Sequence, residues 1–411
     1  MNFMNKLILG PSCAGKSTYI DFLIKNQEIS LDQVIYGFEF SKGKTIQNNS
    51  IVHFNILNYL TKGLNSFFED PVTKYLIDSI ENFDEIIFIV SSISDLKERA
   101  KKRDIVEKNY DKKYANVFWL KIYANLNLFF IYEEIFEYFD LKKKSFRVIW
   151  SSTNLPNKFE QIDRVYVHHI LRGVQKFIFP KQKDVDEFIA SGEYEYQNLL
   201  LPYSQSTINK KSGHIPTNRE LFFDPIKFID LRDSSVLDVG CALGSFLYRA
   251  ERYGAKKICG IDKMEHRYNA SIKIKNFLLS NVEFKNEYFN DNSIKEKFDL
   301  VLCLNVIHHV KDIDTFISNL WKATSKNLVI EFPTFLDPKF MKISKLSNND
   351  SSNLNKLPIM GVSSIKLVDQ TYVYSPSSIV GILVDRGEVE PKNIQQFKSS
   401  FDGRTILVFS K

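Results

Sequence analysis

Two segments of this chain have the same outline: an apolar run, a glycine-rich turn and then a stretch with helical periodicity. The first runs from Leu7 through residues 10–18, which read GPSCAGKST. The second runs from Val236 through residues 240–247, which read GCALGSFL. A buried strand that leads through glycines into a helix begins a βα unit, because glycine allows the sharp turn at the sheet edge. Two such units, far apart in 411 residues, predict two α/β domains.

Strand-like and helical stretches alternate after each turn. In the first series the expected strands are Lys6–Leu9, Gln33–Phe40, Ser50–Leu57, Glu85–Ser92 and Phe146–Ser152. The helices between them are Lys16–Lys25, Pro71–Asn82, Asp95–Tyr110 and Val117–Phe139. The strands of the second series are Ser235–Val239, Lys257–Asp262, Val282–Glu287, Leu300–Asn305, Leu328–Phe332 and Arg404–Phe409. This alternation predicts two doubly wound α/β domains, each built on a parallel sheet.

The two series set the expected domain boundaries. Residues 1–153 form the first domain, residues 234–411 the second, and residues 154–233 a mixed connector with a lead-in arm. The connector has helical patches at Gln161–Gln175 and Asp184–Ser191. Within the second domain, Ser344–Ser364 lacks a periodic pattern, which predicts a surface loop or lid.

The composition, 44% hydrophobic and 25% charged, is that of a globular protein with sizeable cores. The cysteines are far apart and contain no C-x-x-C pair, which argues against disulfides and a structural zinc site; they are Cys13, Cys241, Cys259 and Cys303. The start of the chain has too short an apolar run for a signal peptide, and no run of about 18 apolar residues occurs. We therefore expect a cytoplasmic protein without a membrane span.

The first turn matches the pattern G-x-x-x-x-G-K-[ST] through Gly10, Gly15, Lys16, Ser17 and Thr18. In this pattern the backbone N–H groups and the helix N-terminus face a phosphate. Lys16 is placed to reach the β and γ phosphates of ATP, and the Ser17 hydroxyl to ligate Mg²⁺. The alternative is a glycine turn with an incidental lysine.

Residues 5–153 resemble, through this motif, the P-loop kinases of small molecules, the group of shikimate, gluconate and adenylylsulfate kinases. The resemblance implies a P-loop NTPase fold and two arginines, Arg99 and Arg103, that close over the phosphates. The alternative for these two is a solvated helix face. Such kinases often keep an acidic residue at the end of the third strand, where this chain has His53 and Asn55. Glu39, at the end of Gln33–Phe40, is then the candidate general base.

The second turn has the pattern D-x-G-x-x-x-G through Asp238, Gly240 and Gly244, and it resembles motif I of class I S-adenosylmethionine-dependent methyltransferases. The resemblance implies a Rossmann-like fold in which Asp238 meets the ammonium group of the cofactor. Many relatives carry a third glycine where this chain has Ala242. Asp262, at the end of the second strand, is expected to bind the ribose hydroxyls.

The later strands of this series carry further candidates. Glu287 is expected near the adenine, and Asn305 in the loop after the fourth strand that shapes the methyl-transfer site. His308 or His309 in the same loop could take a proton from an attacking hydroxyl. The alternative is that these histidines hydrogen-bond the local backbone.

The layout of the second domain is similar to that of tRNA wobble-uridine carboxymethyltransferases, and sugar O-methyltransferases share much of it. The similar stretches are Gly213–Arg219, Phe298–Val310, Leu328–Pro333 and Tyr372–Ser377. The charge is nearly balanced, with 20 basic and 19 acidic residues in 1–153 and 24 and 19 in 236–411. A weakly charged surface favours a small-molecule, nucleotide-linked or surface-glycan acceptor over RNA.

Three functions are therefore open. The first is a bifunctional transferase that uses ATP and S-adenosylmethionine on one acceptor, and it is the one we expect. The second is an RNA-modifying methyltransferase, acting for example on tRNA, with an accessory P-loop domain. The third is a non-catalytic ATP sensor that controls the methyltransferase. The acceptor atom, the order of the two reactions and the oligomeric state stay open.

Overall fold

The structure is a computed structural model in which the chain divides into two compact units, Met1–Ile178 and Phe179–Lys411. The division falls inside the stretch expected as a connector. The described residues are 5–26, 28–36, 46, 50–57, 69–106, 117–155, 158–174, 176–192, 194, 197–207, 226, 229–293, 296–362, 372–385 and 389–411.

The N-terminal unit is built on a six-stranded sheet in the order β2-β3-β1-β4-β5-β6. Its strands are β1 (Lys6–Gly10), β2 (Val34–Tyr36), β3 (Ile51–Asn55), β4 (Glu85–Val90), β5 (Arg147–Ser151) and β6 (Phe159–Ile162). The first five are parallel, whereas β6 pairs antiparallel with β5. Strand β1 lies between β3 and β4, so the chain crosses to opposite sides of β1 and leaves a crevice at its carboxyl end.

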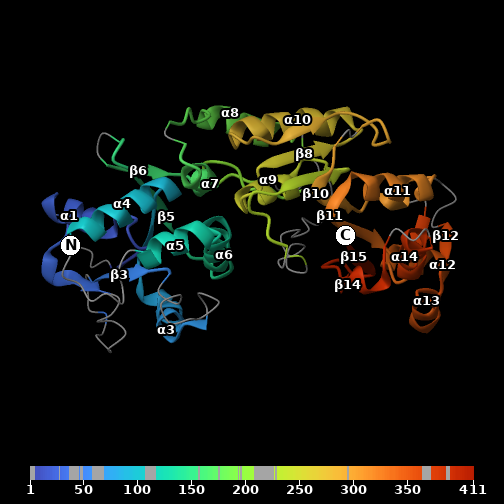
Figure 1. Ribbon diagram of the computed structural model, residues 1–411, viewed down its shortest axis with the longest axis horizontal. Helices are drawn as coiled ribbons and strands as arrows, with labels where there is room; N and C mark the ends of the chain where they lie inside the picture. Colours follow the sequence, from blue (N-terminus) through green and yellow to red (C-terminus); the bar gives the residue numbers. More distant parts are fainter. Residues whose placement is uncertain are drawn as a thin grey trace. The chain divides into compact units, whose positions relative to one another are not determined.

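Helices connect these strands, as Figure 1 shows. They are α1 (Lys16–Lys25), α3 (Pro71–Asp78), α4 (Ile93–Val106), α5 (Val117–Asn125), α6 (Leu128–Leu141) and α7 (Val167–Leu171). The single helix expected over Val117–Phe139 is two helices, because the Asn127 side chain accepts a hydrogen bond from Phe130 N at 3.2 Å and starts a new helix. The helical patch expected over Gln161–Gln175 contains the end of β6 and the short helix α7.

The C-terminal unit is built on a seven-stranded sheet in the order β14-β15-β11-β10-β7-β8-β9. Its strands are β7 (Ser235–Val239), β8 (Lys257–Ile261), β9 (Glu283–Lys285), β10 (Phe298–Leu304), β11 (Thr324–Pro333), β14 (Ile394–Lys398) and β15 (Arg404–Ser410). Strand β15 runs antiparallel to both β11 and β14. The sheet is therefore mixed rather than purely parallel. Strand β14 was not expected from its sequence.

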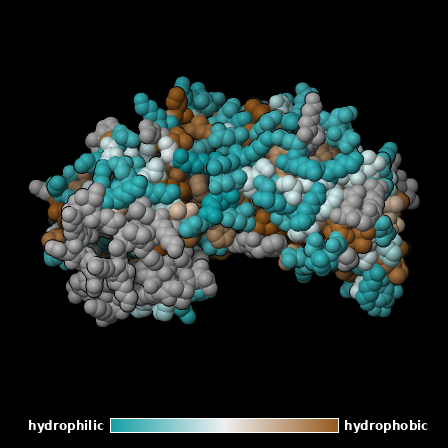
Figure 2. Space-filling model, viewed as in Figure 1, coloured by the Kyte–Doolittle hydropathy of each residue, from teal (hydrophilic) through white to brown (hydrophobic). Residues whose placement is uncertain are grey.

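Helices also cover this sheet (Figure 1). They are α8 (Gln182–Ser191), α9 (Ser245–Arg252), α10 (Glu265–Phe277), α11 (Ile313–Ala323), α12 (Pro338–Ser344), α13 (Asn348–Leu354) and α14 (Pro376–Val384). Side chains of β7, β8, β10 and β11 form a core with those of α11 and α14. Figure 2 shows mostly hydrophilic residues over α10, as expected for a helix with one face on the sheet and one in solvent. Among the described residues, no helix has the length and apolarity needed to cross a membrane.

The stretch Ser344–Ser364 is more regular than its sequence predicts. It contains α13 and the strand β12 (Met360–Val362), which pairs antiparallel with β13 (Tyr372–Tyr374). The Ser347 side chain accepts from Asp350 N, and the Asp350 carboxylate accepts from Ser347, so a capping box starts α13. Its polar sequence lacks the apolar period by which helices are recognised.

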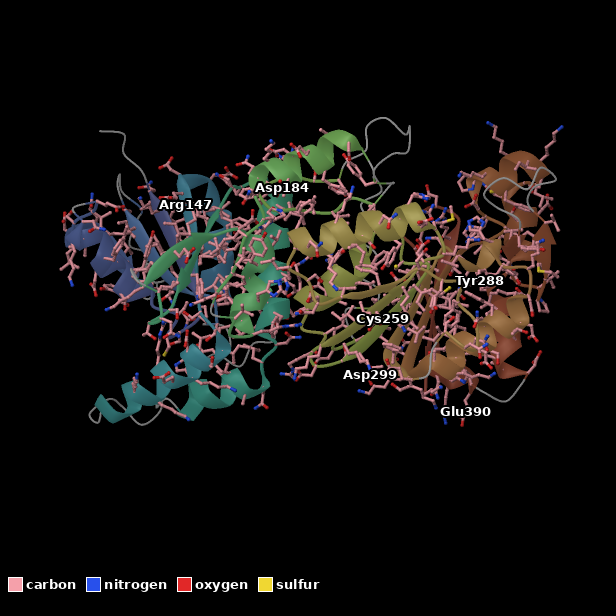
Figure 3. The ribbon with its side chains drawn as sticks, turned by 90° about the horizontal axis from the view of Figure 1, so that it is seen from above. Arg147, Asp184, Cys259, Tyr288, Asp299 and Glu390 are labelled. Atoms are coloured by element: carbon pink, nitrogen blue, oxygen red, sulfur yellow. The ribbon has the colours of Figure 1, made fainter. Side chains whose placement is uncertain are left out.

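The amino ends of three strands are tied together by Asp299, which Figure 3 labels. Its Oδ2 accepts from Ser235 N at 3.0 Å and from Ser235 Oγ at 3.1 Å, and its Oδ1 lies 3.1 Å from Lys326 Nζ. These contacts join β7, β10 and β11 at one edge of the sheet. The opposite, carboxyl edge carries the glycine loop and the candidate site residues.

Candidate functional site

The first glycine loop (residues 10–15) joins β1 to α1 at the carboxyl edge of the sheet. Gly15 precedes α1 with a φ of 96°, in the left-handed region. A Cβ atom at this position would lie 2.6 Å from Ser151 Oγ. Only glycine fits the backbone conformation and the close approach of β5 at this position.

Side chains of the same unit bind the carbonyl groups of this loop. Lys16 Nζ donates to Gly10 O at 2.9 Å and to Pro11 O at 2.6 Å. Arg99 Nη1 donates to Cys13 O at 3.3 Å and to Ala14 O at 3.1 Å. The Tyr123 hydroxyl donates to the carbonyl of residue 12. Each carbonyl from residue 10 to residue 14 therefore has a donor from a side chain.

Arg99 is half-buried against the loop and β5. Its guanidinium also donates to Ser91 Oγ at 3.0 Å and to Ser151 O at 3.2 Å. Burial lowers the pKa of Arg99, and the charge of Asp95 opposes this shift. Arg99 braces the loop, and its expected contact with phosphates stays a prediction. The side chain of Arg103, on α4, and all of Glu39 lie outside the described residues.

The loop opens into a cavity of about 540 Å³, a size that suits a small-molecule ligand. Its lining includes Lys16, Ser17 and Thr18 on one side and His53 and Asn55 on the other. In the described part of the chain, the N–H groups of residues 13 and 15 make no hydrogen bond. These N–H groups and the N-terminus of α1 could hold an anion.

A metal ion in this cavity would need ligands from the bound molecule. Among the residues that the structure describes, no group of three or more His, Cys, Asp or Glu side chains could hold a metal ion. Ser17 is exposed on the cavity wall, where its hydroxyl is accessible. Its expected role as a Mg²⁺ ligand stays a prediction, with phosphate oxygens and water as the other ligands.

The second glycine loop (residues 240–244) joins β7 to α9. Gly240 and Gly244 have φ angles of 77° and 86°. A Cβ atom on Gly240 would lie 2.3 Å from Val306 Cγ2, in the loop after β10. Ala242 has a φ of 50°, so this alanine keeps the left-handed conformation at a cost of about 1–2 kcal/mol.

The N–H groups of this second loop are bound by the protein itself. Gly240 N and Cys241 N donate to Ile261 O at 2.7 and 3.2 Å. Ala242 N donates to Asp262 Oδ2 at 2.9 Å, while Asp262 Oδ1 accepts from Met264 N at 2.8 Å. The carboxylate of Asp262 is thereby fixed beside the loop, at the end of β8. Asp238 is buried on β7, directly before the loop.

The side chain of Gln197 completes this set. Gln197 Oε1 accepts from Leu243 N at 3.0 Å and from Ser245 N at 3.3 Å, and Gln197 Nε2 donates to Cys241 O at 3.2 Å. Gln197 was not among the residues expected at the site, because a glutamine far upstream of the loop carries no motif.

Two buried acceptor atoms lie at the carboxyl ends of β9 and β10. Glu287 Oε1 and Asn305 Oδ1 have no hydrogen-bond partner among the described residues. The Nδ2 of Asn305 donates to the buried carboxylate of Glu331, so its Oδ1 is held in a fixed direction. Tyr288, labelled in Figure 3, is 53% exposed next to Glu287. These acceptors fit a ligand that carries N–H or O–H donors, as S-adenosylmethionine does.

The two histidines lie in the short turn after β10, with ring centroids 4.0 Å apart. Burial lowers the pKa of His308 well below its usual range, and the charges of His309, Arg404 and Lys339 lower it further. His308 is therefore neutral at pH 7, and its Nδ1 has no partner in the described part of the chain. His309 is exposed.

Residues 231–369 match the family model described as "Methyltransferase domain". This part of the chain is a class I methyltransferase domain. The S-adenosylmethionine-dependent methyltransferase fold predicted from the second glycine turn is thereby confirmed.

The curated relatives are tRNA U34 carboxymethyltransferases. That of Campylobacter hominis is 29% identical over 137 residues, which cover 32% of this chain and 47% of the relative. That of Campylobacter concisus is 32% identical over 141 residues, with the same coverage of 32% and 47%. The chain spans about half the length of these relatives. A solved magnesium protoporphyrin IX methyltransferase from Synechocystis PCC 6803 aligns at 17% identity over 60% of this chain and 91% of its own, with a TM-score of 0.34.

Proposed function

We propose that this protein is an S-adenosylmethionine-dependent methyltransferase that acts on RNA, and that its N-terminal unit binds a nucleoside triphosphate. The observation that carries the methyltransferase part is the position of Asp262. Its carboxylate is fixed at the carboxyl end of β8 by the N–H groups of Ala242 and Met264. A carboxylate at this edge is suited to two vicinal ribose hydroxyls.

The other groups of the proposed site follow the same edge of the sheet. Asp238 would face the ammonium group, and Glu287 Oε1 and Asn305 Oδ1 would accept from N–H or O–H donors. When bound, S-adenosylmethionine supplies a methyl group on a positively charged sulfonium. His308 is neutral at pH 7, so it could accept a proton from the attacking group. The site must also hold the attacking group in line for the transfer, and this positioning is its larger contribution to the rate.

Two observations support RNA as the acceptor. The curated relatives carry the name tRNA U34 carboxymethyltransferase, which favours RNA over the small-molecule or glycan acceptor expected from the overall charge. Arg404 and Lys339 also lie close enough to His308 to lower its pKa, so two cationic groups lie near this end of the site, of which Arg404 is 3.8 Å from the Asp337 carboxylate. Cations at this position would attract a phosphate backbone.

The test uses the purified full chain. Titration calorimetry with S-adenosylmethionine is expected to give saturable binding at one site. Transfer of radiolabel from the cofactor is then expected with unmodified tRNA and not with an equal mass of DNA or polysaccharide. Absence of cofactor binding would overturn the methyltransferase proposal, whereas binding with transfer to polysaccharide alone would overturn the RNA acceptor.

The first glycine loop supports a second function, the binding of ATP. Its carbonyl groups are bound by side-chain donors, and its N–H groups at residues 13 and 15 have no described acceptor. This leaves the loop electropositive toward the cavity. Transfer of the γ-phosphate to an RNA end or a small acceptor would make the unit a kinase, and its absence would make it an ATP sensor.

These two alternatives are separated by measuring ATP turnover as well as ATP binding. Lys16→Ala is expected to weaken binding in both. A wild-type chain that binds ATP without turnover on any acceptor would be a sensor. A wild-type chain that binds no nucleoside triphosphate would overturn the proposal for this unit.

A further inference from the structure

The segment before the methyltransferase sheet forms a small hairpin, residues 197–207, which we call the arm hairpin. Leu200 and Ser206 form an antiparallel bridge, and Thr207 N donates to Leu199 O at 3.0 Å. Tyr203 and Ser204 have φ angles of 63° and 57°, as in the two-residue turns that suit the twist of a β-hairpin. The hairpin is therefore a defined element rather than an irregular linker.

The arm hairpin is anchored in the core of its unit. Leu199 and Leu201 are buried. The Thr207 hydroxyl, also buried, donates to Gln197 O at 2.6 Å and accepts from Leu199 N at 2.8 Å. These contacts fix the backbone of Gln197. Its side chain is buried, with 2% of its surface exposed.

The Gln197 side chain reaches the second glycine loop. The Gln197 amide contacts two backbone groups of the loop and one at the first residue of α9: it accepts from Leu243 N and Ser245 N and donates to Cys241 O. Ser245 N belongs to the start of α9, where no carbonyl of the helix can accept from it, and Leu243 N belongs to the loop just before the N-cap Gly244. A primary amide can satisfy both kinds of backbone group at once, because it carries an acceptor and a donor.

We infer that Gln197 is a positioning residue for the cofactor: it sets the shape of the second glycine loop and so the affinity for S-adenosylmethionine. This inference rests on the proposed methyltransferase function and assigns to the arm hairpin a part in cofactor binding. Asp262, which follows the loop in the sequence, holds it from the end of β8. Gln197, which precedes the loop, holds it from the arm hairpin. The loop is thereby fixed before the cofactor arrives, which lowers the entropy lost on binding.

The test compares three variants of the full chain. Gln197→Met keeps the length of the side chain but leaves Leu243 N and Ser245 N without an acceptor. Gln197→Glu keeps the acceptor, replaces the donor to Cys241 O by a second oxygen, and adds a negative charge when ionised. Gln205→Met is the matched control, because it changes the other glutamine of the arm hairpin. The backbone N–H of Gln205, which the substitution keeps, donates to Pro202 O in the turn.

We expect Gln197→Met to raise the Kd for S-adenosylmethionine about tenfold, since about one net hydrogen bond is worth this much. Its KM for the cofactor should rise while kcat at saturation stays unchanged. Amide exchange at residues 243 and 245 should become faster. Gln197→Glu should keep the slow amide exchange of residues 243 and 245, as expected when the acceptor is kept. The control should bind as wild type does.

The outcomes separate this inference from the function on which it rests. If the unaltered chain binds no S-adenosylmethionine, the proposed function fails and this inference fails with it. If the unaltered chain binds the cofactor and Gln197→Met binds it equally well, the inference alone is overturned. If Gln197→Met does not fold, Gln197→Glu decides through amide exchange and affinity together. Slow exchange at residues 243 and 245 with binding near wild type supports the inference, and fast exchange at both residues with an unchanged Kd overturns it.

Discussion

The two glycine loops have the same outline, but other parts of the protein bind the carbonyl groups of the first loop and the N–H groups of the second. Each follows a parallel strand and enters a helix through a glycine in the left-handed region, Gly15 at 96° and Gly244 at 86°. In the first loop, cationic side chains bind the carbonyl groups. In the second, Asp262, Gln197 and a strand carbonyl bind the N–H groups.

This difference indicates which ligand each loop can take. A loop whose carbonyls are bound keeps its N–H groups for an anion such as a phosphate. A loop whose N–H groups are bound has little left for an anion, and it serves by shape and by the carboxylates placed around it. The side chains that brace each loop therefore carry as much information on ligand class as the glycines do.

The largest effect should come from removing the brace of the second loop. Asp262→Ala frees Ala242 N and Met264 N and removes the proposed ribose ligand, so we expect the affinity for S-adenosylmethionine to fall about 100-fold. Titration calorimetry measures this directly. ATP affinity should not change.

Glu265→Ala is the control for this variant, because Glu265 is an exposed carboxylate three residues away. It should bind both ligands as wild type does. Asp262→Ala with wild-type affinity for S-adenosylmethionine would contradict the role given to this carboxylate.

A somewhat smaller effect is expected from Arg99→Met in the first loop. The variant leaves the carbonyls of residues 13 and 14 without their donor, so the loop should lose its shape. We expect ATP affinity to fall about 30-fold and the N-terminal unit to lose about 2 kcal/mol of stability. Calorimetry and urea unfolding measure the two quantities.

Lys102→Met is matched to this change, since Lys102 lies on the same helix and pairs only at the surface with Glu98. It should leave ATP affinity and stability unchanged. Equal losses in both variants would mean that ATP affinity depends on the positive charge of α4 and not on the hydrogen bonds from Arg99 to the loop carbonyls.

Local patterns predicted the parts of the fold that surround each loop. The ranges expected for α1 and β7, Lys16–Lys25 and Ser235–Val239, match the structure residue for residue. Glycine before a helix and an apolar run before glycine are signals carried by neighbouring residues. Edge strands β6 and β14 were missed because their sequences, FEQI and IQQFK, have little apolar character, as expected at the edge of a sheet.

The site residues differ in the same way. Asp238, Asp262 and Lys16 are candidates from motifs, whose spacing is set within one βα unit or between adjacent ones, and their roles stay predictions. Gln197 was missed because its contact with the loop depends on tertiary folding of the arm hairpin. Arg99 was found for its charge, but a sequence cannot show that a guanidinium faces carbonyl groups rather than a phosphate.

Salt should separate the two loops by a modest factor. A triphosphate held near Lys16 and Arg99 is a strongly charged ligand, so we expect its affinity to fall about fivefold between about 0.05 and 0.3 M salt. The affinity for S-adenosylmethionine should change less than about twofold over the same range. Parallel calorimetric titrations test this, and equal salt dependence of the two ligands would break the distinction.

The smallest effect concerns the pH dependence of the C-terminal unit. Burial holds the pKa of His308 well below its ordinary value of 6.5, so the folded state disfavours the charged imidazole. The unfolded state then binds the proton more readily, and stability present above pH 6.5 is lost as the pH falls below it. We expect a loss of about 0.7 kcal/mol between about pH 7 and pH 6.

His308→Gln should remove this part of the slope in urea unfolding, whereas His309→Gln, at an exposed position, should keep it. Equal slopes in wild type and His308→Gln would show that His308 is not held neutral, and would remove it as the candidate proton acceptor.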